Sequence, residues 1–349
     1  MPNVTRLADV IVPEVFLPYV RQRTMELSAF VRSGIVEYLP ELEAAVSAGG
    51  ATINMPFWEE LTGDDQVIPA KGALETTGLK TGHDVAVRLV RGNAWAHHLL
   101  AKVLSGSDPA AALGSMVAEW WVQRDQALLF ALLRGVFGTP DMQGLVHDIT
   151  DKVGHAANIN GVTVLDAKQL LGDASDLLTG IAMHSKTFTN LQQQNLINYV
   201  PASDGKTQIA KYLNEYEVIK DDGMPVDGDM FTTYLFGRGA VGHAEGTIDD
   251  AVETDRRALE SEDILIHRRN LVQHIRGIAW KPSGTGSFTA SEKKPTPGND
   301  ALEKAANWKR VYPLKSIRVV RFVHKLGDMV PHLYKGVATT PIAPEPVVG

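Results

Sequence analysis

The six residues from Gly237 to Gly242 hold three glycines at the spacing of a loop that binds the pyrophosphate of a dinucleotide. Such a loop joins a buried strand to a helix whose first amides hold the phosphates. A strand is expected at 230–236, but His243-Ala244-Glu245-Gly246 follows the glycines and does not favour a helix. We expect turns here, and keep a nucleotide-binding enzyme using 237–242 as one alternative function.

A second phosphate-binding pattern is incomplete. Gly205-Lys206-Thr207 matches the end of a phosphate-binding loop, which needs another glycine five residues before Gly205. Val200 stands at that position, and Pro201 lacks one of the amides that such a loop uses to hold phosphate. The segment therefore predicts no phosphate site.

The histidines do not form a metal-binding pattern. His97 and His98 are adjacent, so on a helix their side chains point about 100° apart. His184 lies between two expected helices, where it favours a capping role. The chain has no cysteine, which excludes disulfides, zinc ribbons, iron–sulfur clusters and thiol nucleophiles. Neither H-E-x-x-H nor G-x-S-x-G occurs. We expect no catalytic, cofactor-binding or metal-binding residues, no cofactor and no enzymatic activity.

The length and net charge of the chain are those of an ordinary globular protein. Its 349 residues suggest roughly two domains at about 150 residues each. The net charge of −7 argues against general affinity for nucleic acid. Arg6, Asp9 and Glu14 rule out a signal peptide at the start of the chain, and no apolar run is long enough to span a bilayer. We expect no membrane partner.

The charge is unevenly distributed along the chain. Residues 1–266 carry 20 Lys and Arg against 36 Asp and Glu, a balance of −16. Residues 267–325 carry 13 basic and 3 acidic residues, a balance of +10. Two solvated surfaces would account for this split. The alternative is self-association, in which the basic face of one copy contacts the acidic face of the next.

The first third of the chain predicts projecting elements. Helical spacing of apolar residues predicts a helix over 14–33, after an extended segment 1–12. Alternation of apolar and polar residues predicts a β-hairpin over 51–92, with a long polar connection at 59–81. A connection of this length is uncommon inside a compact domain, so we expect an arm that contacts another copy; the alternative is a flexible surface loop.

A long helix and a mixed region follow. Apolar spacing predicts a helix over 109–134, with Ser107 or Asp108 as cap and Gly135 as the stop. Two or three short helices are expected within 164–200. The remaining expected elements are strands at 209–219, 230–236, 264–267, 271–280 and 316–324, a loop or edge region at 240–263, a loop at 281–300, and an extended tail at 327–349.

This order of elements resembles the major capsid protein of tailed bacteriophages (Caudoviricetes), which has the Hong-Kong-97-like fold. Several segments also resemble that family: 5–16, 53–58, 61–65, 181–185, 195–197, 234–237 with 239–240, 252–256, 277–280, 307–308 and Tyr312. The likeness covers about residues 4–325. One departure is Ile275-Arg276 after His274, where the family would have a proline, and the tail after Lys325 has no counterpart.

The resemblance implies an α+β fold made of named parts. It implies an N-terminal arm, an extended β-hairpin loop, a peripheral domain with a long spine helix, and an axial domain. Their expected ranges are 1–45 for the arm, 46–95 for the loop, 96–150 with 250–325 for the peripheral domain around the spine helix 109–134, 151–249 for the axial domain, and 326–349 for the tail.

The implied function is a coat protein that assembles as hexamers and pentamers into the icosahedral head shell around double-stranded DNA. Implied partners are further copies, a portal protein, a scaffolding protein and decoration proteins, with DNA held without sequence-specific binding. The implied location is the virion, after assembly in the bacterial cytoplasm. A nanocompartment shell of the encapsulin type is the other alternative. A lysine–asparagine crosslink would pair Lys71 or Lys80 with Asn299 or Asn307 of a neighbour.

Overall fold

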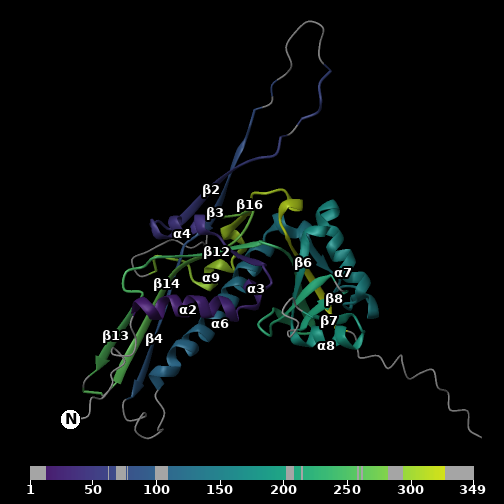
Figure 1. Ribbon diagram of the computed structural model, residues 1–349. Helices are drawn as coiled ribbons and strands as arrows, with labels where there is room; N and C mark the ends of the chain where they lie inside the picture. The colour runs from purple at the N-terminus through teal and green to yellow at the C-terminus, as the bar shows by residue number, and fades with distance from the viewer. Residues whose placement is uncertain are drawn as a thin grey trace, which may run out of the picture.

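The computed structural model of the chain describes residues 13–61, 63–67, 76, 78–98, 109–201, 208–213, 215–257, 259–260, 262–281 and 294–326. Figure 1 shows an elongated molecule with a long β-hairpin projecting from one end. One sheet lies on the side of the N-terminal helices, and a second sheet with its own helices lies on the other side. The expected extended segment 1–12, the Gly205-Lys206-Thr207 pattern and the tail 327–349 lie outside the described residues.

The first sheet is built around β14 (Glu262–Ile275), a strand of 14 residues. Along one edge, β14 pairs first with β13 (Val252–Arg257) and then with β12 (Val241–Gly246), both antiparallel. Along the other edge it pairs with β4 (Leu89–His98), and β1 (Val36–Tyr38) joins β12 in parallel. The predicted strands 264–267 and the start of 271–280 are thus one continuous strand.

The second sheet has eight strands in the order β5-β17-β11-β6-β9-β8-β7, with β10 also paired to β11. Its strands are β5 (Val146–Asp148), β17 (Val319–Lys325), β11 (Met230–Gly237), β6 (Leu178–Met183), β9 (Tyr216–Lys220), β8 (Gln208–Tyr212), β7 (Ile197–Pro201) and β10 (Val226–Asp227). The helices of this region are α7 (Gly161–Lys168) and α8 (Ser185–Gln193), with short 3-10 turns η1 (Pro140–Leu145), η2 (Gly154–Ala157) and η3 (Gln169–Leu177). The two or three short helices predicted within 164–200 correspond to α7, η3 and α8. The assignment of Leu178 and Ile181 to a helix was wrong, because the segment 178–183 is a strand that pairs with β11 on one side and β9 on the other.

The long helix α6 (Pro109–Phe137) confirms the helix predicted at 109–134 and continues for three further residues. Gly135 does not end it. A Cβ at Gly135 would stand 1.9 Å from the carbonyl oxygen of Leu302, at the end of α9 (Asn299–Leu302). The glycine therefore allows two helices to approach closely. Its position near the end of the apolar pattern resembles a helix stop signal, but its role here is packing.

Short elements complete the region around α9. They are β15 (Ile278–Trp280), η4 (Ala305–Asn307), β16 (Trp308–Arg310) and η5 (Leu314–Ser316). β15 pairs with β16, and the indole N–H of Trp308 donates to the Leu302 carbonyl. The chain turns between β14 and β15 at Gly277, whose φ of +87° suits glycine, without the proline that the family resemblance led us to expect.

The N-terminal helix is broken in two. α2 (Pro13–Leu27) and α3 (Ala29–Arg32) together cover the predicted helix 14–33. Ser28 interrupts them, because its hydroxyl accepts from the amide of Val31 and caps the second helix. The next helix, α4 (Pro40–Ser47), packs on β12.

The predicted hairpin is confirmed. β2 (Thr52–Trp58) and β3 (Thr81–Val87) pair antiparallel, with Thr52 opposite Val87 and Trp58 opposite Thr81. Figure 1 shows both strands running away from the body of the molecule. Near the outer end of the paired strands, the Phe57 ring meets Tyr312 edge to face, with centroids 4.5 Å apart. This contact anchors the hairpin on the segment after β16.

The predicted loop or edge region over 240–263 consists mainly of strands, of which β13 lies at the edge of the first sheet and β12 lies inside it. β12 and β13 occupy most of it, and every residue of β12 is buried. Its glycines and charged side chains conceal the strand pattern. A Cβ at Gly242 would stand 2.7 Å from Leu39, and one at Gly246 would stand 2.7 Å from Val46. These glycines let α4 lie directly on the strand.

Candidate functional site

The glycine run at 237–242 forms a turn between two strands. Gly237 ends β11, Gly239 takes a φ of +63°, and β12 begins at Val241. A dinucleotide loop would require a helix there, so the expectation of turns is confirmed.

The histidines considered in the sequence have structural positions in helices and strands. His184 is the N-cap of α8, because its Nδ1 accepts from the Lys186 amide at 3.1 Å. His97 and His98 lie in strand β4, where the helix considered for them does not form. Among the described residues, no group of three or more His, Asp or Glu side chains is placed to hold a metal ion. None of the described helices combines the length and apolar character needed to cross a bilayer.

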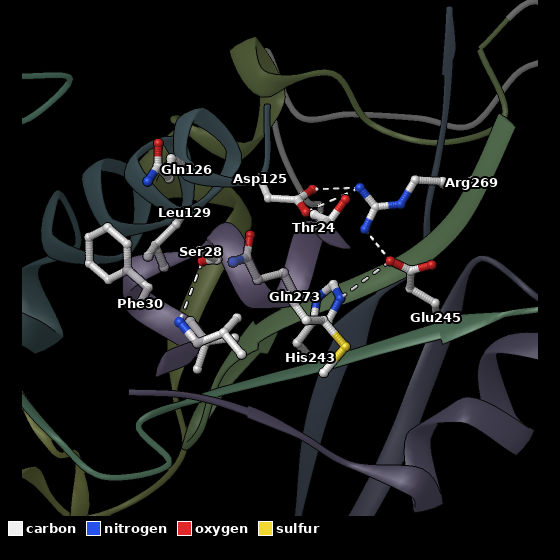
Figure 2. A pocket seen from close by; sticks show the side chains of 13 residues that line it. Thr24, Ser28, Phe30, Asp125, Gln126, Leu129, His243, Glu245, Arg269 and Gln273 are labelled. Carbon is white, nitrogen blue, oxygen red and sulfur yellow. Dashed lines mark hydrogen bonds and ion pairs between the residues drawn. The ribbon is translucent and has the colours of Figure 1, made fainter. Parts of the chain in front are cut away.

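A buried charge cluster joins two strands of the first sheet to two helices (Figure 2). Arg269 on β14 donates from Nη1 to both carboxylate oxygens of Asp125 on α6, each at 3.1 Å. Its Nη2 donates to Glu245 on β12. Arg21 on α2 lies 2.8 Å from the second Glu245 oxygen, and His243 Nε2 lies 3.7 Å from the first. The cluster thus ties α2, α6, β12 and β14 together.

The charges in this cluster depend on one another. The side chains of Arg269 and Glu245 are only 3% and 9% exposed. Burial opposes the charge on Glu245, but Arg269 and His243 outweigh it and hold the pKa of that carboxyl well below its usual range. Burial likewise opposes the charge on Arg269, yet Asp125 and Glu245 raise the pKa of its guanidinium. Both groups remain ionised because each neutralises the other.

Beside the charge cluster, an apolar cluster holds the N-terminal helix on the long helix. Its buried members are Val20, Val117, Ala118, Trp121, Val252 and Leu265. The Trp121 indole donates to His267 Nδ1 at 2.8 Å, and Arg21 also donates to the Gly246 carbonyl at 3.2 Å. The N-terminal helix is therefore positioned by both charge and packing before the chain enters the projecting hairpin.

The described residues at and just beyond the outer end of strands β2 and β3 expose apolar and acidic side chains together. Trp58 is 70% exposed, Leu61 is 77% exposed and Leu79 is 67% exposed. The acidic residues beside them are also exposed: Glu59, Glu60, Asp64 and Asp65. Large apolar side chains at the end of a projecting element mark a surface that contacts another molecule.

The second sheet presents a further apolar surface. Val162 and Leu165, one helical turn apart on α7, are 68% and 48% exposed. Tyr199 on the edge strand β7 is 52% exposed. An edge strand carries unpaired backbone groups, so this side of the molecule is also suited to contact with another copy.

Several basic residues after position 267 form ion pairs within the chain itself. Arg268 pairs with Glu253, Lys315 with Asp173 and Lys325 with Asp229, in addition to Arg269 in the buried cluster. These pairs reduce the basic surface that remains for other copies. The predicted contact between basic and acidic faces of adjacent subunits stays a prediction.

The residues considered for a crosslink have different environments. Asn307 is buried, and its Nδ2 donates to the Ala301 carbonyl at 2.8 Å. Its amide is therefore inaccessible to a neighbouring lysine in this fold. Lys80 and Asn299 are both exposed, whereas Lys71 lies outside the described residues.

Comparison with solved structures identifies the class of fold. The chain is similar to the capsid of Ralstonia phage GP4, with a TM-score of 0.56 at 11% identity over 86% of this chain and 92% of the other. It is similar to the head structure of Helicobacter pylori bacteriophage KHP40, with a TM-score of 0.52, 11% identity, and 86% and 90% coverage. It is also similar to the capsid of cyanophage Pam1, with a TM-score of 0.52 at 12% identity over 86% of this chain and 92% of the other. The fold is the α+β, Hong-Kong-97-like fold of phage capsid proteins.

Sequence comparison identifies the family. The chain is 44% identical over 330 residues to the major capsid protein of Bacillus phage SPP1, covering 92% of this chain and 98% of that protein. No protein-family model matches the chain. At this identity and coverage, the chain belongs to the family of phage major capsid proteins. The capsid interpretation is thereby favoured over the nanocompartment shell and the nucleotide-binding enzyme.

Sequence reasoning missed the buried charge cluster. Arg269 and Asp125 are 144 residues apart, and Arg269 and Glu245 are 24 residues apart, so no local spacing connects them. The one available signal was a charged residue inside an apolar strand, because such residues are rarely buried without a partner.

Proposed function

We propose that this chain forms the icosahedral head shell of a phage by binding copies of itself as hexamers and pentamers around double-stranded DNA. The observation that carries the proposal is the 44% identity to a major capsid protein over nearly the whole chain. The projecting hairpin with exposed Trp58 and Leu61 supports it, since those side chains lack a partner surface within an isolated subunit.

Electron microscopy of the purified, overexpressed protein tests this function. We expect closed shells, capsomers or tubes, with the protein alone or with a scaffolding protein supplied. Particles of uniform monomer size under both conditions would contradict the proposal.

Each part of the chain has a proposed place in the shell. The N-terminal arm is residues 1–45, and the extended loop is residues 46–95. The peripheral domain around α6 is formed by 96–150 with 250–325. The axial domain at hexamer and pentamer centres is formed by 151–249, and the tail by 326–349. The separate first and second sheets support a division into two domains. Strands β5 and β17 enter the second sheet from peripheral ranges, so the two domains interlock.

We further propose that the shell assembles in the bacterial cytoplasm with a portal protein, a scaffolding protein and decoration proteins as partners. The packaged DNA is held by confinement without sequence-specific binding, which agrees with the net charge of −7. The role is structural and uses no catalytic step and no cofactor. Co-purification of the chain with such partners from infected cells tests these contacts, and particles that hold protein cargo without DNA would indicate a nanocompartment.

A further inference from the structure

The N-terminal helix α2 is held on the subunit by few buried contacts. Of its residues 15–27, only Val20 and Thr24 are buried. On its polar side, Arg21 reaches the first sheet and contacts Glu245 at 2.8 Å. Segments with few buried apolar contacts open at a low cost in free energy. The helix is therefore suited to leave the sheet while the rest of the subunit stays folded.

The break between α2 and α3 gives the helix a hinge. Pro18 also lies inside α2, where it removes one backbone hydrogen bond. Ser28, at the break, lines a cavity of about 30 Å³ together with His243 and Gln273 (Figure 2). The cavity has room for about two water molecules, and the buried side-chain oxygen of Gln273 has no hydrogen-bond partner among the described residues. This polar lining favours water beside His243, where a proton can enter.

The charges around Glu245 balance while α2 is in place. Two carboxylates face two guanidinium groups, and these belong to Asp125, Glu245, Arg269 and Arg21. Both oxygens of Asp125 accept from Arg269, which keeps this carboxyl ionised although burial raises its pKa. His243 lies 3.7 Å from Glu245. A proton on its ring would add a charge that no carboxylate of the cluster is left to neutralise.

Departure of α2 removes one positive charge from this cluster, because Arg21 leaves with the helix. One carboxylate charge is then in excess, on a Glu245 side chain that is only 9% exposed. A proton on His243 supplies the missing charge, since its ring already lies beside Glu245. Imidazole groups change charge between about pH 5 and 8. The bound helix with neutral His243 and the released helix with protonated His243 are thus both electrically balanced.

We propose that Arg21 and His243 form a proton-coupled latch, in which protonation of His243 replaces the charge of Arg21 and releases α2 from the first sheet. The released state binds one more proton than the bound state, so a fall in pH favours release. This inference goes beyond shell formation, because it gives the helix that precedes the hairpin two positions selected by pH.

Other ionisable groups lie near the latch. Tyr38 on β1 is directly opposite His243 and donates to Glu43 of α4, and burial raises the pKa of Tyr38 to about 12. His267 on β14 contacts Phe16 of α2 edge to face, but burial lowers the pKa of His267 to about 4. Neither Tyr38 nor His267 changes charge between about pH 7.5 and 5.5. The linked proton is therefore assigned to His243.

Amide hydrogen exchange of the full-length, unassembled subunit between about pH 7.5 and 5.5 tests the latch. The rates are corrected for the intrinsic pH dependence of exchange, and α7, which is capped by Asn160, is the reference helix. We expect the exchange of α2 relative to α7 to rise by up to about tenfold per pH unit as the pH falls, which is the limit for one linked proton.

Two variants separate a latch from a purely structural role. His243→Gln keeps a polar side chain but cannot take the charge, so the exchange of α2 should no longer depend on pH. Arg21→Gln removes the charge that the proton replaces, so α2 should exchange faster at the higher pH and also lose its pH dependence. Arg23→Gln is the matched control. Its pair with Glu26 is more than a third exposed on both sides, so we expect the rates of the unaltered chain.

Three results would overturn the proposal. The first is an α2 exchange rate that does not change with pH in the unaltered chain. The second is a pH dependence that persists in His243→Gln, because the linked proton would then belong to another group. The third is faster exchange in Arg21→Gln with the pH dependence retained, which would leave Arg21 a structural role only. Loss of protection in α7 would reveal a misfolded His243→Gln, and Arg21→Gln then decides. None of these results depends on shell assembly, so they are distinct from a failure of the proposed function.

Discussion

The side chain of Arg269 holds together carboxylates from two different elements, Asp125 on α6 and Glu245 on β12. Its burial means that the ion pairs are worth little compared with a well-packed apolar core, but that breaking them is costly. Loss of the arginine leaves two carboxylates facing each other with only Arg21 and His243 nearby. Together with the apolar cluster around Trp121, this residue therefore helps to hold the long helix on the first sheet.

We predict that Arg269→Met lowers the free energy of unfolding by about 3–5 kcal/mol, since it leaves buried charges unpaired. Arg268→Met is the matched control on the adjacent residue. Its pair with Glu253 is more than a third exposed on both sides, so we expect a loss of about 0–1 kcal/mol. Urea unfolding of the unassembled subunit measures both, and equal losses would contradict the assigned role of the buried cluster.

Two buried histidines predict how stability depends on pH. Burial lowers the pKa of His324 to about 4, and burial together with Arg269 lowers the pKa of His267 to about 4. The unfolded chain, with an ordinary histidine pKa near 6.5, therefore binds more protons than the folded chain between these values. Stability is complete above about pH 6.5 and declines as the pH falls toward 4.

Replacing one of these histidines should remove part of that pH dependence. His324→Gln keeps a polar group next to Thr233, whose hydroxyl lies 2.9 Å from the ring nitrogen. We expect the variant to be less stable at pH 7.5, with a smaller further loss down to pH 4.5 than in the unaltered chain. Urea unfolding across this range measures it, with the exposed His83→Gln as control; an unchanged slope in His324→Gln would refute the assignment.

At the scale of elements, the contact between α6 and α9 depends on the absence of a side chain. Replacing a helical glycine with alanine usually stabilises a helix by about 0.5–1 kcal/mol. At Gly135 we expect the reverse, a loss of about 1–3 kcal/mol, because the new Cβ would overlap the Leu302 carbonyl. Gly114→Ala in the same helix is the control, since its Cβ would meet side-chain rings and no backbone atom, with Tyr19 at 3.1 Å and Phe16 at 3.6 Å. Thermal unfolding of both variants shows whether each substitution raises or lowers the stability of the subunit.

The hairpin is expected to matter for assembly and not for the stability of the subunit. Trp58 is 70% exposed, so Trp58→Ser removes little packing inside an isolated chain. We predict unchanged thermal unfolding of the subunit and fewer or less stable shells by sedimentation. A variant that unfolds more easily but assembles normally would place Trp58 in the core of its own subunit and contradict this role.

At the scale of the whole molecule, the charge split predicts sensitivity of the shell to salt. The +10 balance of 267–325 is partly used inside the chain, by Arg268, Arg269, Lys315 and Lys325. The remaining basic residues are expected to contact acidic surfaces of adjacent copies. High salt screens such exposed pairs, so capsomers should separate more readily as salt rises. Shells equally stable at low and high salt would contradict this expectation.

With no cysteine, disulfides cannot join the subunits. A crosslink through Asn307 is excluded by its burial, which leaves Asn299 as the exposed asparagine of the pair considered. We predict that non-covalent contacts hold the shell. Denaturing electrophoresis of assembled particles should give a single monomer band, and a ladder would reveal covalent joining.

The sequence by itself determined the elements whose patterns are local and long. The apolar spacing of α6 and the alternation in β2 and β3 each follow from which face of a regular element meets the core, so residues close in sequence carry the signal. The order of these elements was sufficient to indicate the family. Tertiary structure decided what no local pattern encodes: β12 as a buried strand despite Gly242 and Gly246, Gly135 as a packing residue, and Arg269 paired with Asp125 across 144 residues. In each case the determining neighbour lies far away in the chain, and only folding brings it within contact distance.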